Sequence, residues 1–301
     1  NINKTFKFKI LSNQNINAFV DENNVIYITS ALIENCNDYV AFLGVLAHEI
    51  GHIEKNHVAQ RKVKISKLKE VNTVSNLSII AGSLISNNPE VLKGIALSTA
   101  SSSDFYLNFS KDQEREADYY SINTLNKLDL YSNSIIDLLK LIEKKNIEKG
   151  IDNSKIKTST HPNFEERIDI INYSKENDKT KFDNKFNRKF NFIKAKFLGY
   201  NGDFQNIKKL DEPYRLYAIS IYEAKKGNLK SSLKILNKLI KKTNSIFLIE
   251  TKADILFSYG YTNESIKFYE KVIYLEPDNK YAQIRFFENV KIEDLSESER
   301  L

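Results

Sequence analysis

The stretch AHEIGHIEKNH at 47–57 constrains the fold of this chain more than any other part of the sequence. His48 and His52 stand four positions apart, and Glu49 directly follows the first of them. On an α-helix this spacing puts both imidazoles on one face, one turn apart, so that both can reach a single metal ion. A carboxylate at 49 can then accept a proton from water beside the metal. The same short pattern also arises by chance on amphipathic helices, so further ligands must come from elsewhere in the chain.

The composition favours helices and limits the classes of function. The 301 residues are enough for two modest domains, and nine Gly and four Pro are few for that length. The net charge is +6, but lysines and acids alternate, so we expect a solvated surface and no nucleic-acid partner. The single cysteine, Cys36, excludes an internal disulfide and a cysteine zinc cluster.

Two further features bear on the compartment. No stretch reaches about 18 consecutive apolar residues, which disfavours a chain embedded in a membrane. The sequence starts at Asn1 and contains no Met, so we expect a processed or trimmed form whose signal peptide is out of view.

Residue patterns predict a short β region followed by helices. Strands are expected at 6–10 and within 17–29, where DENN forms a hairpin turn. Helices are expected over 30–35, from Tyr39 past Gln60 with Asn37 or Asp38 as N-cap, over 110–125, over 132–149 and after Pro162. Small apolar, Ser and Asn residues at 71–109, interrupted by Pro89, predict short helices that can act as a lid or touch a membrane peripherally.

The second half of the chain repeats itself. KGNLKSSLKILNKLI at 226–240 aligns with YGYTNESIKFYEKVI at 259–273, and 197–210 resembles a degenerate earlier unit. Glycines, small residues and large apolar residues recur in register, which is typical of tetratricopeptide repeats; a plain helical bundle is the alternative. We therefore predict a domain at 1–174, a charged linker at 175–190 and a TPR-like helical domain at 191–301.

Other parts of the first half can complete a metal site. Glu114 and Asp118 share a helix face, so one carboxylate can bind the metal while the other accepts the outer N–H of a ligating histidine. His57 lies about 140° round a continuous helix from His52 and is expected to be a partly exposed structural histidine. His161 precedes a helix-starting proline, and Arg167 follows six residues later.

The motifs HEIGH, EREAD and HPNFEER, in this order, resemble the zinc metallopeptidase family of the CAAX prenyl proteases and HtpX-like proteases. The resemblance implies a predominantly α, α+β fold with a zincin-like domain. It also implies one Zn²⁺ per chain, bound by His48, His52 and Glu114. Glu49 would be the catalytic base and Asp118 an outer partner of the ligands. His161 and Arg167 would line the site in transition-state or gating roles.

The resemblance also suggests how substrates and partners bind. Asn17, Ala18 and Phe19 resemble a strand beside the cleft that pairs with substrate backbone. The repeats resemble those of periplasmic members that assist beta-barrel assembly, which implies protein quality control in the cell envelope and a protein partner docked on the repeats. A chaperone or assembly factor with a latent protease site is the alternative. We also expect gating: His161, on a loop, would either complete the zinc shell as a plug or donate to the transition state.

Overall fold

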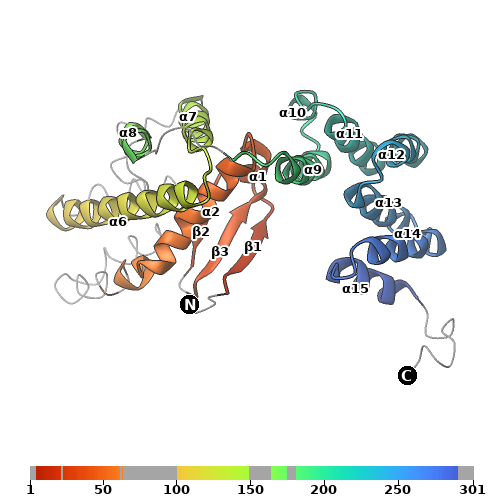
Figure 1. The fold of residues 1–301 in the computed structure, drawn as a ribbon, viewed down its shortest axis with the longest axis horizontal. Coiled ribbons are helices and arrows are strands. Elements are labelled where there is room, and N and C mark those ends of the chain that lie inside the picture. The colour runs from red at the N-terminus through yellow and green to blue at the C-terminus, as the bar shows by residue number, and fades with distance from the viewer. Residues whose placement is uncertain are drawn as a thin grey trace, which may run out of the picture. The chain divides into compact units, whose positions relative to one another are not determined.

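The computed structural model describes residues 5–21, 23–61, 63, 100–148, 164–174 and 181–290, with the backbone alone for 100–110. The chain forms two compact units, 1–187 and 188–301 (Figure 1). His161 and residues 71–99 of the expected lid lie outside the described residues. Residues 100–109, which were also assigned to the lid, are instead the first turns of a long helix.

A small sheet opens the first unit. Its strands β1 (Lys7–Leu11), β2 (Ala18–Val20) and β3 (Val25–Thr29) lie in the order β1-β3-β2. β2 and β3 form the expected antiparallel hairpin, whereas β1 runs parallel to β3. The central strand β3 is mostly buried and β1 mostly exposed, so the core begins beneath β3.

Helices make up the rest of the first unit. They are α1 (Ser30–Asn35), α2 (Tyr39–Glu54), α6 (Ala100–Lys127), α7 (Asn133–Glu148) and α8 (Phe164–Ser174). α2 packs on β2 on one side and on α6 and α7 on the other, and α8 packs on α6 and α7 (Figure 1). α2 is therefore the central element that connects the sheet with the helical layer. The predicted α+β fold, predominantly α, is confirmed by this architecture.

α2 begins and packs as its sequence dictates. The Asp38 carboxylate accepts a hydrogen bond from the backbone N–H of Ala41, an N-cap that satisfies one of the free donors of the first turn. Further along, a Cβ added at Gly51 would lie 3.0 Å from Cβ of Tyr120 and 3.2 Å from the backbone Cα of Ala117. Glycine at 51 thus lets α2 approach α6 closely at the level of the HEIGH motif.

The end of α2 differs from the expectation that this helix runs past Gln60. The helix ends at Glu54, and Asn56 has the left-handed conformation with φ 55°. Helical turns resume at His57. Asparagine tolerates positive φ better than most residues, which explains why the chain turns here.

The second unit is helical throughout its described residues. α9 (Asn184–Asn201) begins within the expected charged linker and crosses the division between the units. The helices that follow are α10 (Phe204–Ile207), α11 (Tyr214–Lys225), α12 (Leu229–Thr243), α13 (Ile246–Ser258), α14 (Thr262–Leu275) and α15 (Lys280–Asn289).

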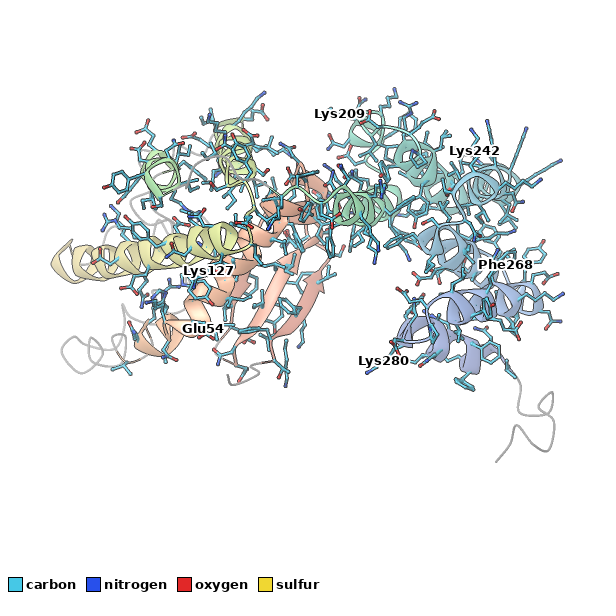
Figure 2. The ribbon with its side chains drawn as sticks, in the orientation of Figure 1. Glu54, Lys127, Lys209, Lys242, Phe268 and Lys280 are labelled. Atoms are coloured by element: carbon cyan, nitrogen blue, oxygen red, sulfur yellow. The ribbon has the colours of Figure 1, made fainter. Side chains whose placement is uncertain are left out.

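Two helix pairs of this unit share the repeated sequence features. Gly227 joins α11 to α12 and Gly260 joins α13 to α14, with φ of 89° and 82°, values that favour glycine. Large side chains at equivalent positions, Leu236 and Tyr269, are fully buried. The helices of each pair also pack on each other; Lys252 of α13, for example, lies over the ring of Phe268 of α14, which Figure 2 labels.

Among the helices that the structure describes, none combines the length and the apolar character needed to cross a bilayer.

Candidate metal centre

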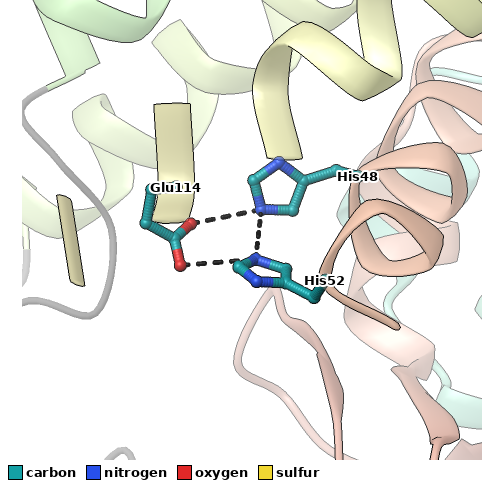
Figure 3. Close-up of side chains that lie close together, drawn as sticks. All are labelled: His48, His52 and Glu114. Atoms are coloured by element: carbon teal, nitrogen blue, oxygen red, sulfur yellow. Dashed lines mark hydrogen bonds and ion pairs between the residues drawn. The ribbon is translucent and has the colours of Figure 1, made fainter. Parts of the chain in front are cut away.

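Three buried side chains meet between α2 and α6 (Figure 3). Nε2 of His48 lies 3.1 Å from Nε2 of His52 and 3.2 Å from Oε2 of Glu114. Nε2 of His52 lies 3.3 Å from the other carboxylate oxygen of Glu114. The four-residue spacing on α2 and the close approach at Gly51 bring these donors together.

These distances suit a zinc ion. Donors 2.0–2.1 Å from a tetrahedral zinc ion lie about 3.3 Å from one another. The two imidazole nitrogens lie 3.1 Å apart and reach different oxygens of Glu114, at 3.2 and 3.3 Å. Two imidazoles and a carboxylate are a ligand set that zinc prefers. Three protein ligands leave a fourth position for water and substrate, as in catalytic zinc sites.

Buried carboxylates surround the three donors. Glu49, Glu114 and Asp118 are at most 4% exposed. Buried Arg167 is paired with Asp118, and Arg61, whose side chain is 19% exposed, lies 3.0 Å from Glu114. Three carboxylates against two guanidinium groups leave one negative charge, which a proton on a histidine or a bound metal ion can balance.

Asp118 orients His48 from the side opposite Glu114. The Asp118 carboxylate lies 2.8 Å from Nδ1 of His48, so Nδ1 carries the hydrogen and Nε2 keeps its lone pair for a metal. Arg167 of α8 donates to both oxygens of Asp118, from Nη2 at 2.6 Å and from Nε at 2.8 Å. Arg167 thereby acts on the site through Asp118, with its Nη2 also 3.4 Å from Nδ1 of His48.

Neighbouring charges shift the titration of these groups in the metal-free protein. Burial lowers the pKa of His48, but the charge and hydrogen bond of Asp118 and the hydrogen bond of Glu114 together outweigh burial and raise that pKa to about 9. Burial raises the pKa of Asp118, but Arg167 and His48 hold it well below its usual range. Burial lowers the pKa of His52. The metal-free centre therefore holds a proton on His48, which a metal ion would displace.

Glu49 lies in the same buried region without being one of the three converging ligands. It is 4% exposed, and its charge acts on both His52 and Arg167. A buried carboxylate next to a metal position can serve as a general base.

His57 was predicted to be partly exposed, and this prediction is wrong. His57 is fully buried, with Nδ1 2.9 Å from Nδ1 of His52 and Nε2 3.1 Å from Oε2 of Glu116. The prediction assumed a continuous helix, whereas the turn at Asn56 redirects the His57 ring towards His52. No sequence motif marks this contact, although an Asn between two helical segments could have suggested the break.

Arg61 and Gln113 also contact the centre without having been predicted. Arg61 donates to Oε1 of Glu114 at 3.0 Å and to Oε1 of Gln113 at 2.7 Å. The amide of Gln113 donates in turn to the backbone carbonyl of His57 at 3.3 Å. These contacts tie the segment after α2 to α6.

The predicted substrate strand is an edge of the sheet. Ala18 and Phe19 lie in β2, which pairs only with β3 among the described strands, and Phe19 stacks on Tyr27 with ring centroids 5.0 Å apart. The backbone of Asn17 is bonded to Thr29, which anchors the start of this edge. An edge strand presents unpaired backbone groups that can accept another extended chain.

Comparison with known proteins agrees with this geometry. The model of peptidase family M48 matches residues 2–175. The beta-barrel assembly-enhancing protease of Yersinia pestis is 28% identical over 123 residues, which cover 40% of this chain and 25% of that protein. A Vibrio cholerae protein that provisionally bears the same name is 27% identical over 133 residues, 43% of this chain and 27% of the relative. The matches thus span about a quarter of the length of these relatives.

Proposed function

The chain belongs to peptidase family M48, a family of zinc-dependent metallopeptidases, and from that premise we propose that it hydrolyses internal peptide bonds of protein substrates with one zinc ion per chain. The observation that carries the proposal is the buried convergence of His48, His52 and Glu114, whose imidazole nitrogens and carboxylate oxygens lie 3.1–3.3 Å apart.

The residues around the zinc position have separate roles in this proposal. Zinc supplies Lewis acidity, which polarises a carbonyl and makes water more acidic. Glu49 accepts a proton from the attacking water and returns it to the leaving amine. Asp118 holds His48 with its Nε2 towards the metal, and Arg167 keeps Asp118 ionised and in place. Oxyanion stabilisation is assigned to His161, because Nε and Nη2 of Arg167 donate to Asp118.

Substrate binding is assigned to the edge of β2. A peptide that pairs with Ala18–Val20 would continue the sheet and lie along the side of β2 that is unpaired among the described strands. α2, which carries HEIGH, packs directly on β2, so a peptide added there runs close to the helix of the catalytic motif.

The second unit is assigned to partner docking. The two helix pairs with Gly227 and Gly260 at their turns support tetratricopeptide-like repeats, which commonly form concave binding surfaces. The names of the relatives from Yersinia pestis and Vibrio cholerae associate them with beta-barrel assembly. We extend this to the chain as protein quality control or outer-membrane assembly in the periplasm, with a protein partner bound to the repeats.

The test compares the wild-type protein with Glu49→Gln in metal analysis and casein digestion. Glutamine has the same shape but cannot take a proton at neutral pH, so the variant should keep its zinc and fold and lose activity by about 100-fold or more. A wild-type protein that binds zinc but hydrolyses nothing would favour the alternative, a chaperone or assembly factor with a latent site. Full activity in Glu49→Gln would remove Glu49 as the base.

A further inference from the structure

The second zinc-site histidine has an outer partner, His57, that lies outside the HEIGH motif. We propose that His57 and Glu116 form a relay that positions His52 for metal binding, and that His57 is a positioning residue of the peptidase. This inference rests on the proposed zinc site and adds two residues, one buried and one at the surface, to those that shape it.

The relay follows from which of the contacting atoms can donate a hydrogen and which can only accept one. Oε2 of Glu116 lies 3.1 Å from Nε2 of His57, and since a carboxylate only accepts, Nε2 of His57 carries the hydrogen. Nδ1 of neutral His57 is then bare and accepts from Nδ1–H of His52 at 2.9 Å. Consequently Nε2 of His52 is left with its lone pair, directed towards His48 and Glu114.

The local fold brings the His57 ring against His52, next to the metal position. The left-handed Asn56 ends α2 and starts a new helical turn, which brings the fully buried His57 ring edge-on to His52, with centroids 5.0 Å apart at 74°. Gln113 then holds the backbone carbonyl of His57 at 3.3 Å. Both ends of the contact are therefore fixed, by the turn on one side and by α6 on the other.

In the relay, the outer nitrogens of both zinc-site histidines are linked to a carboxylate. Nδ1 of His48 is bonded directly to Asp118, whereas Nδ1 of His52 is bonded to His57, which in turn is bonded to Glu116. Partners of this kind fix the tautomer and ring orientation of a ligand, and their loss typically weakens metal binding about 10–100-fold. They differ in setting, because the Asp118 side chain is 5% exposed and that of Glu116 is 56% exposed.

The test uses four variants of the full-length chain. His57→Phe removes both hydrogen bonds while keeping a buried ring, and His57→Gln restores an acceptor and a donor. Glu116→Gln changes only an exposed carboxylate and should leave folding intact. Asp112→Asn, an exposed carboxylate on the same helix, is the matched control.

Two measurements are made on each variant. Zinc affinity is determined by competition with a zinc indicator, on protein from which a chelator has removed the metal. The tautomer of His52 is determined by ¹⁵N NMR of metal-free protein with labelled histidines. We expect affinity to fall about 10–100-fold in His57→Phe and less in Glu116→Gln, with His57→Gln recovering most of the loss and Asp112→Asn unchanged. His52 should hold the Nδ1–H tautomer in the wild type and lose that preference in His57→Phe.

The relay is wrong if His57→Phe and Glu116→Gln bind zinc like Asp112→Asn and keep the His52 tautomer. That result is distinct from failure of the proposed function, in which the wild-type protein itself would bind no zinc or hydrolyse no protein. Glutamine at 116 can still accept a hydrogen bond from Nε2–H of His57, so a fifth variant, Glu116→Ala, removes the acceptor altogether. Because Glu116 is at the surface, this variant decides the question even if His57→Phe does not fold.

Discussion

Glu114 comes from α6 and lies within 3.3 Å of both histidines of α2. We predict that Glu114→Ala lowers zinc affinity by more than about 100-fold, beyond the range for outer partners, because it removes a ligand and not merely its support. Zinc content after dialysis against a weak chelator measures the loss, with Asp112→Ala as a control on the same helix. Stoichiometric zinc in Glu114→Ala would exclude Glu114 as a ligand.

The proton on His48 gives the centre a defined pH dependence. Burial lowers the pKa of His48, but Asp118 and Glu114 together raise it to about 9, so the metal-free site is protonated at neutral pH. Zinc must displace that proton, so deprotonation of His48 alone should raise the apparent zinc affinity about tenfold for each pH unit. This rise should stop near pH 9. Calorimetry at pH 7 in two buffers should show about one proton released from this group. In Asp118→Asn the release should shrink, because an amide lacks the charge that raises this pKa; equal release would contradict the assignment.

At the scale of elements, Gly51 controls the distance between α2 and α6. We predict that Gly51→Leu destabilises the first unit by about 1–3 kcal/mol and weakens zinc binding, because the helices that carry the ligands must separate. Gly51→Ala should be close to neutral, since about 1 kcal/mol of helix propensity offsets the tight contacts of the new Cβ with Cβ of Tyr120 and Cα of Ala117. Denaturant unfolding measures the stability of each variant and zinc titration measures its zinc affinity, with Glu54→Leu as a control on α2. Unchanged zinc affinity in Gly51→Leu would show that the helix separation is not critical.

The helices and strands show which features of the fold could be predicted from the sequence. The hairpin, the start of α2 at Asp38 and the α6 face with Glu114 and Asp118 could be predicted, because caps and periodicities act locally. The position of His57 could not, because it depends on one left-handed residue, Asn56. The parallel pairing of β1 with β3 and the contacts of Arg61 are tertiary, and no local pattern encodes them.

At the scale of the whole molecule, only the first unit contains the candidate zinc centre, and each unit has its own core. The second unit is centred on large buried side chains such as Tyr217, Leu236 and Tyr269. We predict two unfolding transitions in calorimetry, and zinc should raise the midpoint temperature of only the one that belongs to the first unit. Zinc at about 100 times its Kd contributes about 2.7 kcal/mol, which corresponds to roughly 5–10 °C for a unit of this size.

Two controls assign the transitions. His52→Ala should abolish the zinc response, and Tyr269→Ala should lower the transition that zinc leaves alone. If both transitions moved together with zinc, the units would unfold as one, and the division between 1–187 and 188–301 would carry no thermodynamic meaning.

The ligands of the candidate centre are separated along the chain, and this separation has a consequence during synthesis. His48 and Glu114 are 66 positions apart, and Arg167 follows on a later helix. A growing chain presents its N-terminal part first, so the HEIGH segment leaves the ribosome well before the carboxylate that completes the metal site. On the proposed zinc site, a nascent chain therefore has both histidines before the third ligand, and a complete site would require nearly the whole first unit. The order of the residues along the chain delays the enzyme until its own first unit is ready to fold.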